Sequence, residues 1–308
     1  MKKILLVGSA NMDLSLNMYE LPAPGETVLD DGGVAYTPGG KGANAAVALS
    51  KLGAEVVFSA KLGRDLHGQK LFEYYKSQGI NTSEIKVDPD APTGFAVVMK
   101  EGSTGQNRIV VYPGANSNLN TENLIEAFRC NPDALYLGFE IPFSVAQSAA
   151  KIAAARGIPI FIDAAPASAD YPLQTLGQIE IFSPNETETY IYTGIKPMGS
   201  DSSLRAALEL YKRVKCKYIV IKQGERGSFI YDGKKYYMIP AEPVKRVVDT
   251  TAAGDTFTAA MPLEYLRSGD ILAAVKYATA AASITVSRSG ASVSVPTAKE
   301  VEDLLRSR

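Results

Sequence analysis

Residues 134–162, ALYLGFEIPFSVAQSAAKIAAARGIPIFI, contain the pattern that decides the fold. An apolar run at Ala134–Leu137 precedes an alanine-rich helical stretch at Phe143–Ala155, and a second apolar run follows at Ile158–Ile162. Gly157, just past the helical stretch, suits the left-handed conformation that ends many helices. Short apolar runs on either side of a helix are typical of buried parallel strands joined by a crossover. The stretch therefore predicts a strand–helix–strand unit.

The same alternation continues toward both ends of the chain. Further buried strands are expected at Ile4–Val7, Val56–Ala60, Ile179–Phe182 and Tyr218–Ile221. Further helices are expected at Ala43–Leu52, Gly68–Gln78 and Ser203–Arg213. Repeated alternation of this kind predicts an α/β fold, with a mostly parallel sheet and helices on both faces. We expect residues 1–308 to form a single α/β domain.

Two insertions, at about residues 12–38 and 92–112, interrupt the alternation. Apolar and polar residues alternate from Met12 to Met18. The second insertion holds two strand-like runs, Phe95–Lys100 and Arg108–Tyr112, joined by the turn-rich segment 102–105. Period-two alternation is typical of a half-exposed antiparallel sheet. We therefore expect a small β flap beside the main domain; the alternative is a pair of surface hairpins without a function.

Composition excludes several classes of partner and site. The formal net charge is −1, so nothing in the charge balance favours nucleic acid or an anionic membrane as a partner. With one histidine and two cysteines, a His-dependent triad or a His/Cys metal cluster would need other groups. Cys130 and Cys216 are expected to be reduced, as in a cytoplasmic protein. No apolar run approaches the roughly 20 residues of a membrane span.

The strongest chemical signal is Asp249-Thr250-Thr251-Ala252-Ala253-Gly254-Asp255-Thr256-Phe257, which leads into a helical pattern. Small residues before a helix let its first N–H groups approach a ligand, and the helix dipole favours an anion there. Asp255 falls in the first turn. Its carboxylate could simply cap the helix, but an acceptor beside an anion site also suits a hydroxyl that attacks a phosphate.

A second segment, Gly39-Gly40-Lys41-Gly42-Ala43-Asn44, also leads into a helix. Its glycines allow the backbone to approach a ligand closely. Gly40, Gly42 and Ala45, with Asp65 further on, also fit a loose dinucleotide-binding pattern, so a nicotinamide-dependent dehydrogenase is an alternative. The segment does not follow a clean buried strand, which argues against that alternative. The sequence contains no P-loop motif.

Polar residues and glycines also follow several expected strands. They are Asn11 and Asp13, Glu140, Asn185, Glu186 and Glu188, and Gly224 and Gly227. Ligands of open α/β sheets bind outside the carboxyl ends of the strands, so these groups should converge on one crevice. Their amides and carboxylates suit the hydroxyl groups of a sugar.

These segments together identify a resemblance to a known family. Several segments resemble the motifs of the ribokinase (PfkB-type) carbohydrate kinases, in the same order over nearly the whole chain: Asn11-Met12-Asp13, Gly39–Asn44, Pro113-Gly114-Ala115-Asn116, Pro184-Asn185-Glu186 and Asp249–Phe257. The resemblance implies an ATP-dependent kinase that phosphorylates a primary hydroxyl of a small sugar, with D-ribose the expected substrate. A nucleoside, deoxyribose, fructose or a sugar phosphate are alternative substrates, and a non-catalytic sugar or nucleotide sensor is an alternative function.

The resemblance also implies a role for individual residues. The base would be Asp255, and the amides of Ala252, Ala253 and Gly254 would form the anion hole. The sugar site would contain Asn11, Asp13, Gly39, Gly40, Lys41, Asn44 and Glu140. Asn185 and Glu188 would hold phosphate and Mg²⁺, partly through water, and the nucleotide would be bordered by Lys222, Gly224, Gly227, Gly254 and Thr279. A monovalent cation such as K⁺ would lie at Asp249, Thr251, Thr285, Arg288, Gly290 and Ser294. The β flap would be a lid over the sugar and the contact of a homodimer.

Some positions depart from the family pattern. Lys222-Gln223 replaces a commoner pair of threonine and a hydrophobic residue, and Thr279 stands where Asn or His is frequent. Pro262 lies in the helix after Asp255, where it removes one backbone hydrogen bond and predicts a kink. His67 is expected at the surface without a role.

Overall fold

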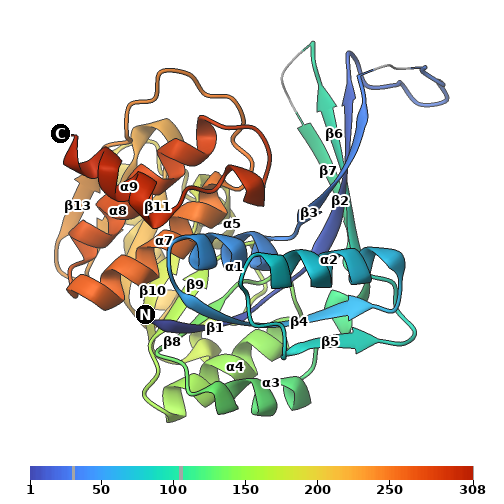
Figure 1. Cartoon of the computed structure of the whole chain (residues 1–308). Coiled ribbons are helices and arrows are strands. Elements are labelled where there is room, and N and C mark those ends of the chain that lie inside the picture. Colours follow the sequence, from blue (N-terminus) through green and yellow to red (C-terminus); the bar gives the residue numbers. More distant parts are fainter. Residues whose placement is uncertain (30–31, 104–106, 308) are drawn as a thin grey trace.

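The computed structural model describes residues 1–29, 32–103 and 107–307, and its central layer is a long, mostly parallel sheet (Figure 1). In this described part, nine strands follow the order β13-β12-β11-β10-β9-β8-β1-β4-β5. The strands from β11 to β5 run parallel, whereas β12 and β13 are antiparallel additions at one edge. The bounds are β1 Lys3–Val7, β4 Glu55–Gly63, β5 Ile85–Asp88, β8 Ala134–Leu137, β9 Ile160–Asp163, β10 Ile179–Ser183, β11 Cys216–Lys222, β12 Ser228–Tyr231 and β13 Tyr236–Ile239.

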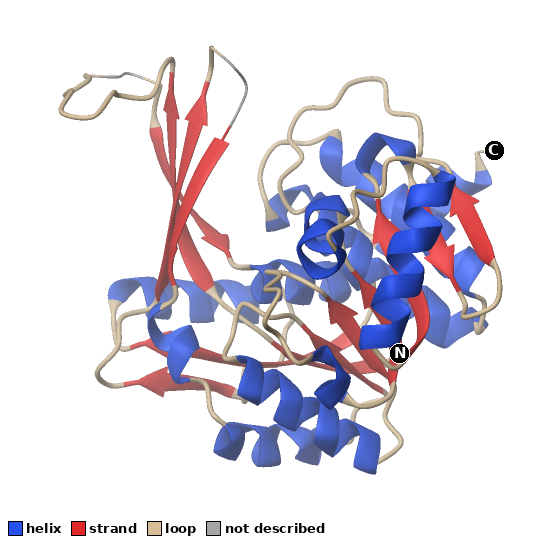
Figure 2. Ribbon diagram, turned by 180° about the vertical axis from the view of Figure 1, so that it is seen from behind, coloured by secondary structure: helices blue, strands red, loops and turns tan. Residues whose placement is uncertain are grey.

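Helices cover both faces of this sheet (Figure 2). Alternate strand residues point to opposite faces, so Ile4 and Leu6 pack in one core cluster while Leu5 and Val7 pack in the other. The first cluster includes side chains of α1 (Lys41–Lys51), α2 (Leu66–Ser77), α7 (Ala253–Ser268), α8 (Ile271–Val286) and α9 (Ala298–Arg306). The second includes side chains of α3 (Thr121–Ala127), α4 (Phe143–Ala155), α5 (Glu186–Thr193) and α6 (Ser200–Arg213). The predicted fold class is confirmed.

The two insertions form a second sheet, in the order β3-β2-β6-β7, which projects from the body (Figure 1). Its strands are β2 (Asn11–Met18), β3 (Val34–Gly39), β6 (Gly94–Glu101) and β7 (Asn107–Tyr112). We call it the lid sheet. The expected antiparallel pairing holds for β2 with β3 and for β6 with β7, but β2 and β6 pair in parallel. Both strands leave the body in the same direction, so when they pair they can only be parallel. Of the expected turn at 102–105, Thr104 and Gly105 lie outside the described residues.

Two local predictions about helices can be compared with the structure. Gly157 adopts a positive φ angle just past α4, as the capping argument requires, and Gly53 and Gly79 do the same just past α1 and α2. Pro262 lies inside α7, which continues through it to Ser268. Of the helices that the structure describes, none is long and apolar enough to cross a membrane.

Candidate active site

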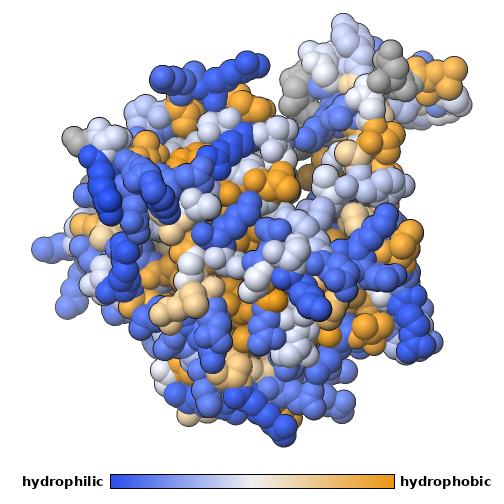
Figure 3. All heavy atoms as spheres, in the orientation of Figure 1, coloured by the Kyte–Doolittle hydropathy of each residue, from blue (hydrophilic) through white to orange (hydrophobic). Residues whose placement is uncertain are grey.

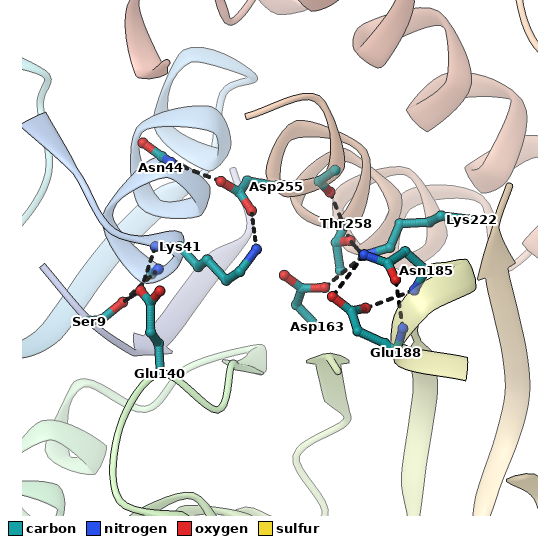
Figure 4. Close-up of polar contacts among 12 residues, drawn as sticks. Ser9, Lys41, Asn44, Glu140, Asp163, Asn185, Glu188, Lys222, Asp255 and Thr258 are labelled. Carbon is teal, nitrogen blue, oxygen red and sulfur yellow. Dashed lines mark hydrogen bonds and ion pairs between the residues drawn. The ribbon is translucent and has the colours of Figure 1, made fainter. Parts of the chain in front are cut away.

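The carboxyl edge of the main sheet brings the first two sequence motifs together. After β1, the carbonyl of Ser9 accepts a hydrogen bond from Ala43 N at 2.9 Å, which fixes the start of α1 beside the strand. Glu140, three residues past β8, accepts hydrogen bonds from Ser9 Oγ at 2.5 Å and from Lys41 N at 3.0 Å (Figure 4). A carboxylate at a helix N-terminus is favourable, because it accepts an otherwise unpaired N–H and opposes the positive end of the dipole.

Asp13 lies on β2 against Gly39 of β3. A β-carbon at Gly39 would stand 1.9 Å from Asp13 Oδ2, so this position admits no side chain while the carboxyl stays where it is. Asp13 Oδ1 is buried and has no hydrogen-bond partner in the described part of the chain. Burial raises the pKa of Asp13 to about 7, and repulsion by Glu140 and Asp255 adds to the effect. Asp13 Oδ1 is therefore a buried acceptor that a hydroxyl group of a ligand could satisfy.

Asn11 is held by a residue that the sequence did not single out for the site. Asn116 donates from Nδ2 to Asn11 Oδ1 at 2.8 Å and accepts from Ala10 N at 2.9 Å. Asn116 is buried just after the lid strand β7, in the segment Pro113–Asn116 that already contributed to the family resemblance. That match was the signal that could have identified it.

Asp255 lies in the first turn of α7 with only 6% of its surface exposed. Its Oδ2 accepts a hydrogen bond from Asn44 Nδ2 at 2.8 Å, and Lys41 Nζ lies 3.8 Å from Oδ1 (Figure 4). Burial raises the pKa of Asp255, while the positive charge of Lys41 opposes the rise. The glycine-rich segment thus contributes two partners to one carboxylate, although 211 residues separate Asn44 from Asp255.

The turn before Asp255 is tight. Ala252 has a φ of 61°, a left-handed conformation that is unusual for a residue other than glycine. Of the amides expected to form the anion hole, that of Ala253 donates to Thr250 O at 3.3 Å. A β-carbon at Gly254 would meet nothing within 4 Å, so the segment is open on the side of Gly254.

A second polar cluster lies beside Asp255 at the ends of β9, β10 and β11 (Figure 4). Asn185 and Glu188 form a reciprocal capping box at the start of α5, with Asn185 N donating to Glu188 Oε2 at 2.7 Å and Glu188 N donating to Asn185 Oδ1 at 2.8 Å. Burial raises the pKa of Glu188, and Lys222 opposes this. Asp163, which the sequence analysis missed, pairs with Lys222 at 2.7 Å. It ends β9, so the strand-end rule applied to that strand would have identified it.

The remaining residues expected at the nucleotide follow β11 or lie on α8. Gly224 and Gly227 bound a short turn, and a β-carbon at Gly227 would stand 2.0 Å from Ile239 O. Thr279 lies on α8, where its hydroxyl donates to Val275 O at 2.7 Å in the same helix. Among the residues that the structure describes, Thr279 has no hydrogen bond or ion pair with the Asp255 cluster.

The residues expected to hold a monovalent cation only partly come together. Asp249 Oδ1 accepts from Thr251 N and Oγ1 at 2.9 and 2.6 Å, and Asp249 Oδ2 accepts from Gly290 N at 3.3 Å. Thr285 and Ser294 direct their hydroxyls to backbone carbonyls of their own segments, and the Arg288 guanidinium pairs with Glu300.

A lysine of the lid reaches the same carboxylate. Lys100 Nζ, on β6, lies 3.3 Å from Asp249 Oδ2 and so connects the lid sheet to the segment before α7. A cavity of about 650 Å³ opens here, lined by residues of β2, β6 and the 247–250 segment; it lies beside Asp249 and does not include Asp255.

The structure also shows the surroundings of His67 and of the loose dinucleotide pattern at Gly40–Ala45. His67 is not a bare surface residue: it is partly buried, and its ring packs 5.7 Å from those of Tyr36 and Phe95 in the lid sheet. The loose dinucleotide pattern at Gly40–Ala45 follows lid strand β3 and not a strand of the main sheet, so it lacks the context of a nicotinamide site.

Comparisons of sequence and of overall structure relate this chain to known proteins. A model of the pfkB family of carbohydrate kinases matches residues 1–298. Ribokinase of Staphylococcus aureus is 34% identical over 305 residues, covering 98% of this chain and 99% of that protein. The bifunctional ribokinase/ribose-5-phosphate isomerase A of Fructilactobacillus sanfranciscensis is 36% identical over 309 residues, and the chain spans 56% of that longer protein. The structure of Arabidopsis thaliana ribokinase complexed with ribose and ATP superposes with a TM-score of 0.89 at 34% identity, covering 99% of each chain.

Proposed function

This chain belongs to the pfkB family of carbohydrate kinases, and from that premise we propose that it transfers the γ-phosphoryl group of ATP to the 5-hydroxyl of D-ribose. The observation that carries the proposal is the buried carboxylate of Asp255, held by Asn44 at the N-terminus of α7. The relatives named ribokinase and the related structure with ribose and ATP support this choice of substrates.

The sugar is expected between the lid sheet and the start of α1. Asp13, with its unpartnered Oδ1, and Asn11 would accept or donate hydrogen bonds to ribose hydroxyls. Gly39 and Gly40 let the Asp13 carboxyl group and the backbone of Asn11 approach closely, because a β-carbon at either position would collide with them. Glu140 and Lys41 hold the start of α1, and Asn44 orients the base.

The transfer itself requires a base, an anion site and the exclusion of water. Asp255 takes the proton of the ribose hydroxyl as the oxygen bonds to phosphorus, so a base that is ionised at neutral pH is sufficient. The N-terminus of α7, with the amides of Ala252, Ala253 and Gly254, would stabilise negative charge on the phosphoryl oxygens. The lid sheet would cover the sugar and exclude water that could hydrolyse ATP.

ATP with Mg²⁺ would occupy the second polar cluster. Magnesium in kinases is usually held by one or two carboxylates, substrate phosphates and waters, and the buried carboxylate of Glu188 beside Asn185 fits that donor set. Bound there, Mg²⁺ would neutralise charge on the phosphates. Lys222, Gly224, Gly227, Gly254 and Thr279 would border the nucleotide.

We also propose that a monovalent cation such as K⁺ binds near Asp249, with contributions from Thr251, Thr285, Arg288, Gly290 and Ser294. Support comes from Asp249, whose carboxylate joins Thr251 to Gly290. K⁺ should raise both the rate and the melting temperature relative to a bulky inert cation. Equal values of both in the two salts would contradict the site.

A homodimer through the lid is a further proposal, and a cytoplasmic location fits the free thiols of Cys130 and Cys216. Large apolar or aromatic side chains lie exposed on the lid sheet, among them Val34, Tyr36, Ile109, Val110 and Tyr112. Figure 3 shows orange, hydrophobic atoms exposed on this projecting part of the molecule. These residues lie on β3 and β7, the two edge strands of the lid sheet, and exposed apolar surface of this kind commonly marks an interface. Sedimentation of the protein tests the assembly, and a monomer at all concentrations would refute it.

A substrate panel tests the function directly. ADP release with Mg-ATP and K⁺ should be measured with D-ribose, 2-deoxyribose, fructose, fructose 6-phosphate, adenosine and pseudouridine. Strong turnover with ribose alone is expected. Turnover with another member would keep the mechanism and change the substrate, whereas ATP binding without turnover on any member would favour the sensor.

A further inference from the structure

The ammonium group of Lys222, at the end of β11, lies between two parts of the site (Figure 4). Nζ donates to Asp163 Oδ1 at 2.7 Å and to Thr258 Oγ1 at 2.9 Å. The side chains of Lys222 and Asp163 are 12% and 4% exposed. An ammonium group has three N–H donors, so one of them has no hydrogen-bond partner among the residues that the structure describes.

Thr258 connects the ammonium group to the turn before Asp255. Its hydroxyl accepts from Lys222 and donates to the carbonyl of Gly254 at 2.9 Å, one helical turn back along α7. One turn of an α-helix rises about 5 Å. The positive charge of Lys222 therefore lies close to the helix N-terminus where the phosphoryl group is expected.

The backbone of Lys222 connects the same group to the other side of the site. Lys222 N donates to Pro184 O at 2.9 Å, and Lys222 forms a parallel bridge with Asn185, the first residue of the Asn185–Glu188 capping box. A phosphoryl group in transfer must lie between the base and the metal-bound phosphates. Lys222 occupies that interval.

Stability alone does not account for this ion pair. A buried ion pair contributes little net stability, because desolvation of both charges offsets their attraction, and apolar replacements are often neutral. A lysine held by one carboxylate and one hydroxyl, with a donor left over, has the form of a prepared phosphate contact.

We propose that Lys222 donates a hydrogen bond to a non-bridging oxygen of the transferring phosphoryl group, and that Asp163 and Thr258 are positioning residues for it. The inference rests on the proposed ATP-dependent transfer. In that step the bond from the ribose oxygen to the γ-phosphorus forms while the bond from that phosphorus to the β–γ bridging oxygen breaks. The hydroxyl proton passes to Asp255, ADP leaves with the bonding electrons, and Lys222 keeps its protons.

Lys222→Met and Asp163→Asn, with Lys217→Met as a matched control on the exposed part of β11, test the proposal. Turnover is measured together with calorimetric affinities for the β,γ-imido analogue of ATP, for AMP and for ribose. Lys222→Met should lower kcat by about 100-fold, the usual effect of losing a preorganised donor to a developing anion. It should weaken the imido analogue by about tenfold and leave AMP and ribose unchanged, because only the analogue carries the γ-phosphoryl group. Lys217→Met should match the parent.

Asp163→Asn separates the phosphate contact from a merely structural pair. If the pair only holds β9 to β11, both variants should lose the same affinity and stability. If Lys222 binds phosphate, Asp163→Asn should leave the analogue bound as tightly as in the parent or more tightly, because the lysine charge is no longer neutralised. Equal losses in the two variants overturn the proposal.

Two further outcomes are decisive. A Lys222→Met protein with kcat within about threefold of the parent and unchanged analogue affinity refutes the contact, since a charged hydrogen bond is worth more than that. If Lys222→Met does not fold, Lys222→Gln is judged by the same measurements. Should the parent phosphorylate no sugar, the proposed function fails by itself, and the comparison of the analogue with AMP still decides the role of Lys222.

Discussion

Replacement of Asp255 by Asn is the most direct perturbation of the proposed reaction. The amide keeps the size of the carboxyl group and can still accept a hydrogen bond from Asn44 Nδ2, which lies 2.8 Å from Oδ2 in the parent. What is lost is the base and the negative charge 3.8 Å from Lys41 Nζ. A positioned general base contributes about 10²–10⁴-fold to a rate, which corresponds to about 3–5 kcal/mol of transition-state stabilisation.

The same substitution should not destabilise the protein. Burial raises the pKa of Asp255, so above that pKa the folded state holds its carboxylate at a cost that a neutral amide removes. The melting temperature of Asp255→Asn should therefore equal or exceed that of the parent at pH 8. Lost activity in a protein of unchanged or higher stability is then a chemical effect.

The assay is ADP release coupled to a reporter enzyme, under saturating ribose and Mg-ATP, with a ribose affinity measured by calorimetry. Asp303→Asn, on the exposed face of α9, is the control and should retain full activity. A kcat for Asp255→Asn within about tenfold of the parent would refute the assignment of the base, because it lies below the range for general-base catalysis.

Three further predictions concern the sugar side and the turn before the base. Asp13 must be ionised to accept two hydroxyl hydrogen bonds, so ribose affinity should fall as the pH drops through about 7. The free protein should gain stability over the same interval, because the pKa of Asp13 is raised in the folded state. Calorimetry and thermal melting at several pH values check both effects, and an affinity that does not change with pH contradicts the role of Asp13. Gly39→Ala should raise the KM for ribose by more than about tenfold, because the new β-carbon displaces the Asp13 carboxyl group. Gly199→Ala is the control, since nothing lies within 4 Å of its β-carbon, and its KM should not change. Equal KM values for the two variants would show that the close approach of Gly39 to Asp13 does not affect ribose binding. Ala252→Gly removes the strain of a left-handed alanine, about 1–2 kcal/mol, and adds about 1 kcal/mol of conformational entropy to the unfolded chain. Urea unfolding should therefore show equal or slightly higher stability for Ala252→Gly, whereas Ala253→Gly should lose about 1 kcal/mol. Equal losses in the two variants would mean that Ala252 is unstrained.

Much of the fold could be predicted because buried parallel strands and alanine-rich helices leave clear local patterns. Ala134–Leu137 and Phe143–Ala155 were located to the residue. The pairing of β2 with β6 was not, because period-two alternation says which faces are buried but nothing about the direction of a neighbouring strand. That direction depends on where each insertion leaves the body, which is a property of the whole sheet.

The candidate site divides in the same way. Motifs with unusual local composition, such as Gly39–Asn44 and the segment around Asp255, could be identified from glycine and small-residue content alone. Asp163 has no such local composition, because a single aspartate at the end of an apolar run does not by itself indicate a site; only the strand-end rule could have identified it. Its meaning comes from Lys222, which lies 59 residues away and two strands across the sheet.

The strand-end rule explains why such a pair can still be anticipated in part. Because β9, β10 and β11 are parallel neighbours, the residues that end them lie at one edge, and a charge on any of these strands must meet its partner or a ligand there. The sequence analysis noted Lys222 only as a departure from the family pattern. The order β11-β10-β9 is what makes Asp163 its counter-charge. A buried lysine at the end of β11 therefore requires a counter-charge at the same edge, and Asp163 supplies it while leaving one N–H donor of Lys222 for the transferring phosphoryl group.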